Sequence, residues 1–202
     1  MTRSLEDVLA SRRMCRDFSP APLTPAVVEP VLAAAFAGPR AGNTHGLHLV
    51  VLEGPETARY WDVTLPVERR ATFRWPGLLR APVLALLLVD PAAYVARYAE
   101  PDKARTGLGG SSSVWPVPYW FVDAGSAAMS VLLAAESAGL GALWFGPFGH
   151  ESELLSALGV PEGMRAAGTL ALGRRAVADE ATSASARRGR PDPAAFVHRG
   201  GW

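Results

Sequence analysis

Apolar residues recur at helical spacing in several parts of the chain, which predicts a set of amphipathic helices. The strongest candidate spans 123–139, where mostly small residues form a wide apolar face and Gly139 ends the helix. A second helix is expected from Pro25 to Ala35, with Thr24 as its N-cap and Pro25 in its first turn. Further short helices are predicted at 5–13, 55–68 and 151–158, and Pro66 is expected to interrupt the second of these.

One long apolar run, 81–90, shows no alternation with polar residues, which favours a strand buried on both faces. Shorter strands are expected at 48–53, 142–145 and 168–173. Helices and strands follow one another without a regular βαβ repeat. The order therefore favours an α+β architecture, with a central sheet flanked by helices on both faces.

The C-terminal part of the chain differs from the rest in composition. Residues 176–190 are polar and rich in Ala and Ser, which predicts an extended arm rather than packed core. A length of 202 residues suits one domain. We therefore expect a single domain over 1–202, in which 176–202 form an extended C-terminal arm.

Composition and charge exclude several classes of partner. The net charge is +1, so nothing suggests nucleic-acid binding. The longest apolar run is far shorter than the roughly 20 residues of a membrane helix, and the N-terminus has no signal-peptide pattern. Cys15 is the only cysteine, so no intrachain disulfide can form. We expect a cytoplasmic protein with no membrane partner.

A Gly- and Ser-rich stretch at 107–113 precedes an aromatic and proline cluster at 114–121. A flexible hinge beside a rigid aromatic cluster is typical of a substrate lid. The alternative is a surface loop whose aromatic side chains fold back into the core. On the first interpretation, the substrate wall would comprise Trp115, Tyr119 and Trp120.

Two basic clusters stand near opposite ends of the chain: Arg12, Arg13 and Arg16, and Arg187, Arg188 and Arg190. Converging arginine forks bind phosphate dianions, although isolated clusters are more often solvated. No metal site is expected, because His45, His48 and Cys15 supply too few ligands. Gly139-Leu140-Gly141 is too short to be a dinucleotide-binding fingerprint.

Four segments in this order resemble the nitroreductase-like family of FMN-dependent oxidoreductases. They are 11–18 (SRRMCRDF), 38–45 (GPRAGNTH), 139–149 (GLGALWFGPFG) and 187–202, and the resemblance extends from Leu5 to Trp202. It implies an intertwined homodimer with a mostly antiparallel sheet and FMN bound at the interface. It also implies ping-pong transfer, in which NAD(P)H gives hydride to flavin N5 and a nitroaromatic, a quinone or a similar small acceptor then takes the electrons.

The resemblance also implies roles for individual residues. Arg12, with Arg188 or Arg190, would bind phosphate, and Arg16 would face the flavin N1 and C2 carbonyl. The 39–45 turn would reach the flavin from the partner subunit, and the backbone N–H of Gly146 would donate to N5. No side chain need act as acid or base, so no catalytic residue is named. The implied cofactor ligands are Arg12, Arg13, Met14, Arg16, Pro39, Arg40, Ala41, Asn43, Phe145, Gly146, Pro147, Arg188 and Arg190, and Phe148 joins the substrate residues.

The chain departs from the family pattern at four positions. Met14 and Arg40 replace serines, His45 replaces a common Gln, and Pro147 has no N–H to donate. These departures leave open a flavin- or ligand-binding protein without nicotinamide-driven turnover, or one with specialised flavin chemistry. The physiological acceptor, and the choice among NADH, NADPH and another donor, also stay open.

Overall fold

A computed structural model describes residues 3–177 and 188–202 of the chain. Its centre is a four-stranded antiparallel sheet in the order β1-β2-β4-β3. The strands are β1 (Leu47–Glu53), β2 (Val83–Val89), β3 (Gly141–Phe145) and β4 (Arg165–Gly173). The α+β architecture is therefore confirmed. All of β2 is buried, as the unbroken apolar run predicts.

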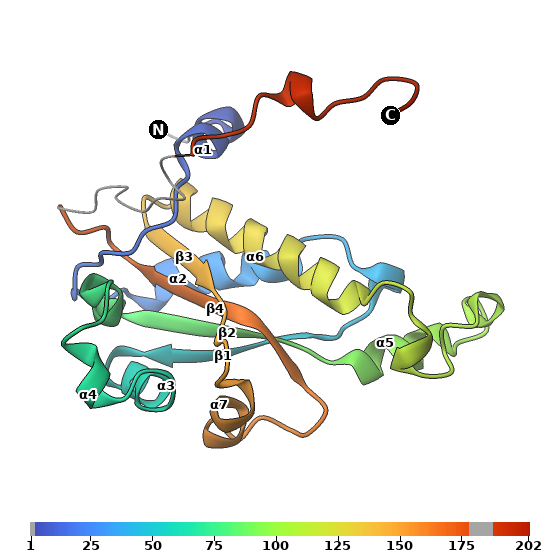
Figure 1. Ribbon diagram of the computed structural model, residues 1–202, viewed down its shortest axis with the longest axis horizontal. Coiled ribbons are helices and arrows are strands. Elements are labelled where there is room, and N and C mark those ends of the chain that lie inside the picture. Colours follow the sequence, from blue (N-terminus) through green and yellow to red (C-terminus); the bar gives the residue numbers. More distant parts are fainter. Residues whose placement is uncertain (1–2, 178–187) are drawn as a thin grey trace.

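Helices cover both faces of this sheet (Figure 1). One face carries α2 (Pro25–Ala33) and the long helix α6 (Tyr119–Ser137), and the other carries α3 (Thr57–Thr64) and α7 (Glu151–Ala157). The remaining helices are α1 (Leu5–Ser11), α4 (Val67–Arg70) and α5 (Pro91–Tyr98). None of the helices in the described part of the chain is long and apolar enough to cross a membrane.

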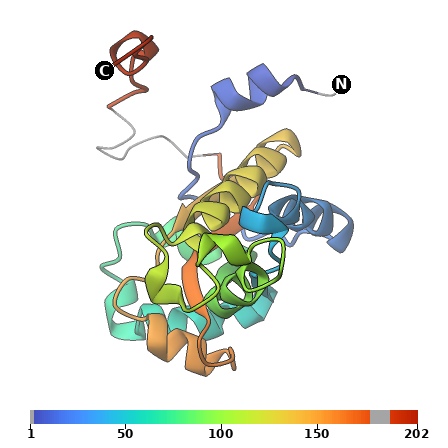
Figure 2. The ribbon, with the colours of Figure 1, turned by 90° about the vertical axis from the view of Figure 1, so that its right-hand side faces the viewer.

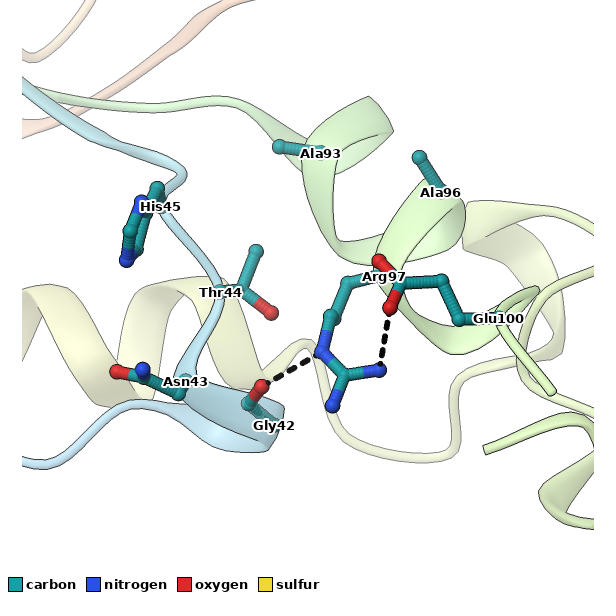
Figure 3. A pocket seen from close by; sticks show the side chains of 8 residues that line it. All are labelled: Gly42, Asn43, Thr44, His45, Ala93, Ala96, Arg97 and Glu100. Carbon is teal, nitrogen blue, oxygen red and sulfur yellow. Dashed lines mark hydrogen bonds and ion pairs between the residues drawn. The ribbon is translucent and has the colours of Figure 1, made fainter. Parts of the chain in front are cut away.

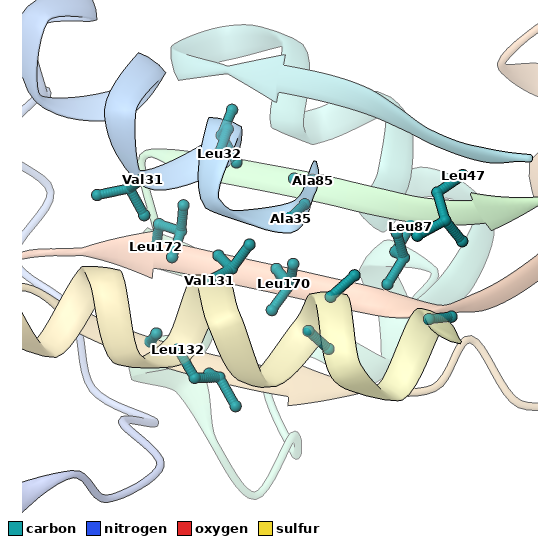
Figure 4. Packing of buried hydrophobic residues seen from close by; sticks show 14 of the residues in the cluster. Val31, Leu32, Ala35, Leu47, Ala85, Leu87, Val131, Leu132, Leu170 and Leu172 are labelled. Carbon is teal, nitrogen blue, oxygen red and sulfur yellow. The ribbon is translucent and has the colours of Figure 1, made fainter. Parts of the chain in front are cut away.

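Alternating residues of β2 divide between two hydrophobic cores. Ala85 and Leu87 belong to the core beneath α6 and α2, whereas Leu84 and Leu86 belong to the core beneath α3 and α7. Figure 4 shows α6 lying across the sheet, with Val131 and its neighbours against β2 and β4. Small residues on this face of α6 let the helix approach the sheet closely, which explains its wide Ala-rich stripe.

Several boundaries differ from the sequence-based expectations. Helix α6 begins at Tyr119, four residues early, directly after Pro118. The interruption expected at Pro66 is confirmed, since the stretch 55–68 is divided there into α3 and α4, because proline cannot donate the backbone hydrogen bond that continues a helix. Helix α5 was not predicted, although the Asp90 side chain caps it at 2.9 Å and Pro91 occupies its first position.

Helix α1 is joined to the end of α6 by one buried carboxylate. Glu136, which is 8% exposed, accepts hydrogen bonds from Arg3 at 3.0 Å, Ser11 at 2.8 Å and Arg175 at 3.0 Å. Figures 1 and 2 show α1 and the C-terminal segment 188–202 beyond this end of α6, outside the layers of the body. The C-terminal segment 188–202 is exposed throughout, whereas Arg187 lies outside the described residues, and the extended arm over 176–202 stays a prediction.

Candidate functional site

The N-terminal arginine segment lies along the edge strand β3. Met14 forms a parallel bridge to Ala142, and the Cys15 N–H donates to the Ala142 carbonyl at 2.8 Å. A Cβ atom added at Gly141 would lie 2.7 Å from Cys15 Sγ, so this close approach requires glycine. The structure thus brings the segment 11–18 beside the strand that leads to Gly146.

Arg12 holds a buried donor that lacks an acceptor. Its Nη1 atom is shielded from solvent and has no hydrogen-bond partner in the described part of the chain. A buried guanidinium donor without an acceptor is energetically costly, and such groups usually face an ion, a ligand or water. An anion beside Arg12 would satisfy it.

The two basic clusters meet at the end of α1. Arg190 donates to the backbone carbonyls of Leu9 and Ala10, two residues before Arg12. A cation is favourable at a helix C-terminus, where backbone carbonyls lack helical partners. Arg188 is exposed two residues away along the same segment.

The other arginines of the first cluster are held by different contacts. The Arg13 carbonyl accepts from Arg175 at 3.1 Å, and Arg175 also donates to Glu136. The guanidinium carbon of Arg16 lies 5.2 Å from the centroid of the Trp75 ring. Backbone and side-chain contacts therefore fix this segment in one conformation.

The segment 39–45 forms a tight turn beside the start of α6. Gly42 and Asn43 both adopt left-handed backbone conformations, with φ of 61° and 53°. The Ala41 N–H donates to Asp123 at 2.8 Å, and Arg97 donates to the Gly42 carbonyl at 2.9 Å (Figure 3). An open pocket of about 520 Å³ lies between this turn and α5.

Sequence reasoning missed Asp123, Tyr94 and Arg97, which hold this turn. Asp123 is 6% exposed and accepts from Tyr94 as well as from the turn, at 2.8 Å. Burial, reinforced by this hydrogen bond, raises the pKa of Tyr94, so its hydroxyl remains a donor. The available signal was an acidic residue on the apolar face of the predicted helix.

Within one chain, the turn and the arginine segment lie at opposite ends of α6. Asp123 contacts the turn, whereas Glu136 contacts α1 and Arg175. Thirteen residues of helix between these two carboxylates correspond to roughly 20 Å. A single chain therefore does not bring the two predicted halves of the site together.

The aromatic cluster after the Gly- and Ser-rich stretch folds back into the core. Trp115 is 7% exposed, its indole N–H donates to the Leu108 carbonyl at 3.0 Å, and its ring centroid lies 4.7 Å from that of Tyr98. Trp120 is equally buried, and of the three aromatic residues expected in the substrate wall only Tyr119 is exposed. The structure thus favours the packing interpretation over a lid, because these large rings fill the space around Tyr94.

The end of β3 and the segment that follows it place one aromatic side chain toward the core and one toward solvent. Phe145 stacks on Trp61, with ring centroids 6.1 Å apart. Phe148 is 89% exposed, yet its ring lies over Gly146, where an added Cβ would come within 2.7 Å of ring atoms. Gly146 thus lies beside an exposed aromatic ring, whereas Phe145 contributes to the core.

Known proteins resemble this one over most of the chain. The sequence profile of the nitroreductase family matches residues 9–174. A protein of Archaeoglobus fulgidus named as an NADH dehydrogenase/NAD(P)H nitroreductase is 24% identical over 169 residues, which cover 82% of each chain.

Solved structures share the fold at lower identity. A nitroreductase from Desulfovibrio desulfuricans in complex with FMN has a TM-score of 0.71 and 20% identity, covering 100% of this chain and 99% of its own. An FMN-dependent nitroreductase from Clostridium difficile R20291 has a TM-score of 0.66 and 17% identity, covering 96% of this chain and 98% of its own. These likenesses establish the fold.

Proposed function

Because the chain belongs to the nitroreductase family, we propose that it is an FMN-dependent oxidoreductase that takes electrons from NAD(P)H. The names of its relatives support this proposal, since one is called an NAD(P)H nitroreductase, one structure is in complex with FMN, and another is called an FMN-dependent nitroreductase. An electron-poor small molecule, such as a nitroaromatic or a quinone, would be the acceptor.

The unpartnered Nη1 donor of Arg12 is the observation that carries the proposal. Phosphate oxygens are strong acceptors for guanidinium groups, and a second guanidinium, that of Arg190, reaches the backbone only two residues away. The residues present therefore fit the phosphate of a mononucleotide. Arg188 is exposed on the same segment and would add a third cation.

Other residues of this chain would place the isoalloxazine ring and tune it. When bound, FMN would supply hydride transfer at its N5 atom between NAD(P)H and the acceptor. Arg16 would hold positive charge near the N1 edge, where negative charge develops when the flavin is reduced, and it would therefore favour reduction. The Gly146 N–H would donate toward N5, whereas Pro147 has no N–H to offer. Tyr119 and Phe148 are exposed aromatic surfaces for a flat acceptor.

We propose that the complete site needs two chains. The separation of the 39–45 turn from the arginine segment along α6 supports a site in which each chain contributes one half. Apolar side chains are also exposed on α6 (Val122 and Met129), and at the ends of the chain (Leu5, Phe196 and Trp202). Exposed apolar surface of this kind favours association, so a homodimer is the expected state.

The absorption spectrum of the purified protein, recorded before and after anaerobic addition of NAD(P)H, tests the proposed function. We expect flavin bands that bleach with NADH or NADPH. Flavin that stays oxidised would contradict the nicotinamide donor and favour a binding role or another donor. A colourless protein that cannot be reconstituted with FMN would refute the proposal.

The phosphate assignment is tested separately with the double variant Arg12→Met/Arg188→Met. We expect it to lose FMN during gel filtration, because two cations facing the phosphate are gone. Arg105→Met is a matched control, since Arg105 is exposed in a surface turn outside both basic clusters. Full flavin content in the double variant would exclude these arginines as phosphate ligands.

A further inference from the structure

Three consecutive residues of the 39–45 turn are each held by a different group. Asp123 accepts from the Ala41 N–H at 2.8 Å, and Arg97 donates to the Gly42 carbonyl at 2.9 Å. The third contact is within the turn, where Arg40 Nη2 donates to Asn43 Oδ1 at 3.2 Å. The turn is therefore fixed at its backbone and at one side chain.

The backbone of Asn43 needs this support. Its φ of 53° is the only positive value among the non-glycine residues that the structure describes. Left-handed conformations are unfavourable for residues with a Cβ and persist where surrounding contacts enforce them, commonly at functional sites. The contacts of Ala41 and Gly42 enforce it here.

Arg40 determines which end of the Asn43 amide is free. Its Nη1 donates to the Phe36 carbonyl at 2.8 Å, so the planar guanidinium bridges the preceding helical turn and the Asn43 side chain. One lone pair of the amide oxygen is thereby used, which orients the amide group and directs its NH₂ donors away from Arg40. Figure 3 shows the Asn43 side chain on the opposite side of the turn from Arg97.

We propose that Arg40 is a positioning residue that fixes the Asn43 amide as a hydrogen-bond donor toward the bound flavin. This inference rests on the proposed function and deepens it. The ligand atom that meets the Asn43 NH₂ group must then be an acceptor, such as a flavin carbonyl or an unprotonated ring nitrogen. Donation from a positively charged partner polarises the amide and strengthens its N–H groups as donors, which favours an electron-rich, reduced ligand.

Two other roles for Arg40 make different predictions. A direct contact between its charge and the ligand would act independently of Asn43, and a lysine would preserve part of it. A purely local role in closing the turn would not depend on which atom of Asn43 is free. Substitutions at Arg40 and Asn43 distinguish these two roles from the proposed one. A positioning residue acts only through the Asn43 amide, so its effect should depend on which residue stands at position 43.

FMN affinity of the apoprotein, measured by flavin fluorescence titration, is the first readout. Arg40→Met should weaken binding about threefold to tenfold, because the amide is no longer oriented. Arg40→Lys should resemble it, since an ammonium lacks the fork that bridges Phe36 and Asn43. Asn43→Asp keeps a partner for Arg40 but removes the donor, so it should weaken binding by at least about tenfold and lower the flavin midpoint potential.

A double-mutant cycle decides whether Arg40 acts through Asn43. In an Asn43→Ala background, Arg40→Met should change the FMN dissociation constant by less than about twofold. Fully additive effects, or FMN affinity in Asn43→Asp equal to that of the wild type, would overturn the proposal. Full rescue by Arg40→Lys would also overturn it, because charge alone would then suffice.

Side-chain amide NMR signals test the orientation without flavin. The Asn43 NH₂ signals are assigned by their disappearance in Asn43→Ala. In the wild type, their chemical shifts should differ from those of solvent-exposed amides. In Arg40→Met, the chemical shifts should move toward the values of solvent-exposed amides. An unchanged pair would refute the proposal whether or not FMN binds. A wild type that does not bind FMN but shows the Arg40-dependent shift would refute the proposed function alone.

Discussion

Arg190 donates a hydrogen bond to the Ala10 carbonyl at 3.1 Å, although 180 positions separate the two residues in the sequence. The contact joins the C-terminal segment to the end of α1, immediately before the arginine segment. It brings the second basic cluster to the first, and a single anion between them could contact both. The phosphate site itself stays a prediction, and the contact supports it by placing Arg190 near Arg12 in the same chain.

Replacing Arg190 with methionine should weaken FMN binding about tenfold, because one charge-assisted contact is lost. The dissociation constant should also depend less on salt, since one fewer cation faces the phosphate. Fluorescence titration at two salt concentrations measures both effects. Arg199→Met, nine residues further along the same exposed segment, should leave both unchanged. Equal effects of the two substitutions would indicate a general electrostatic contribution only.

Glu136→Gln should destabilise the protein by about 1–3 kcal/mol at neutral pH, because Arg3 and Arg175 lose their carboxylate partner. Burial alone raises the pKa of Glu136, but donation from Ser11, Arg3 and Arg175 outweighs it and lowers the pKa below 4.5. A lowered folded-state pKa gives stability that is present above 4.5 and lost as the pH falls through the folded value.

Urea unfolding as a function of pH measures this contribution. The difference between the wild type and Glu136→Gln should shrink below pH 4.5, because the carboxylate of the unfolded wild-type chain takes up a proton there before that of the folded chain does. A difference that stays constant down to pH 3 (roughly one pH unit below ordinary carboxyl values) would show that charge at this position does not stabilise the fold.

Asp123→Ala should cost about 2–4 kcal/mol of unfolding free energy, because it leaves the Tyr94 hydroxyl and the Ala41 N–H without an acceptor. Adding Tyr94→Phe to that variant should cost less than the same change in the wild type, since the unpaired hydroxyl is removed. Thermal unfolding of the four proteins gives the coupling. Ser137→Ala, at the exposed end of the same helix, is the control and should change stability little.

Ionisation of Tyr60 should make the fold less stable at alkaline pH. Burial raises its pKa from 10.0 to about 12, although the hydrogen bond from Thr169 partly offsets the rise. A raised folded-state pKa gives stability that is complete below pH 10 and lost as the pH rises toward 12. At neutral pH, Tyr60→Phe should be about 1 kcal/mol less stable than the wild type, because the hydrogen bond from Thr169 is lost. Above pH 10 the wild type loses stability and the variant does not, so the difference in unfolding free energy should disappear.

Much of the fold could be predicted from the sequence because its periodicities are strong. An apolar run such as 81–90 can only avoid water between two layers, so β2 is buried on both faces. The Ala-rich stripe of α6 similarly predicts a helix packed closely on the sheet. Boundaries such as Tyr119 could not be predicted, since the burial of Trp120 against Tyr94 depends on contacts distant in sequence.

The candidate site, like the fold, could be predicted from the sequence only in part. The arginine clusters could be identified as candidate phosphate ligands from the sequence alone, because guanidinium chemistry does not depend on the fold. The folded chain was needed to show that Arg190 contacts α1, that Asp123 and Arg97 hold the turn, and that Trp115 lies in the core. The physical reason is that hydrogen bonding and burial at long sequence separation arise when the chain packs, and local patterns do not encode them.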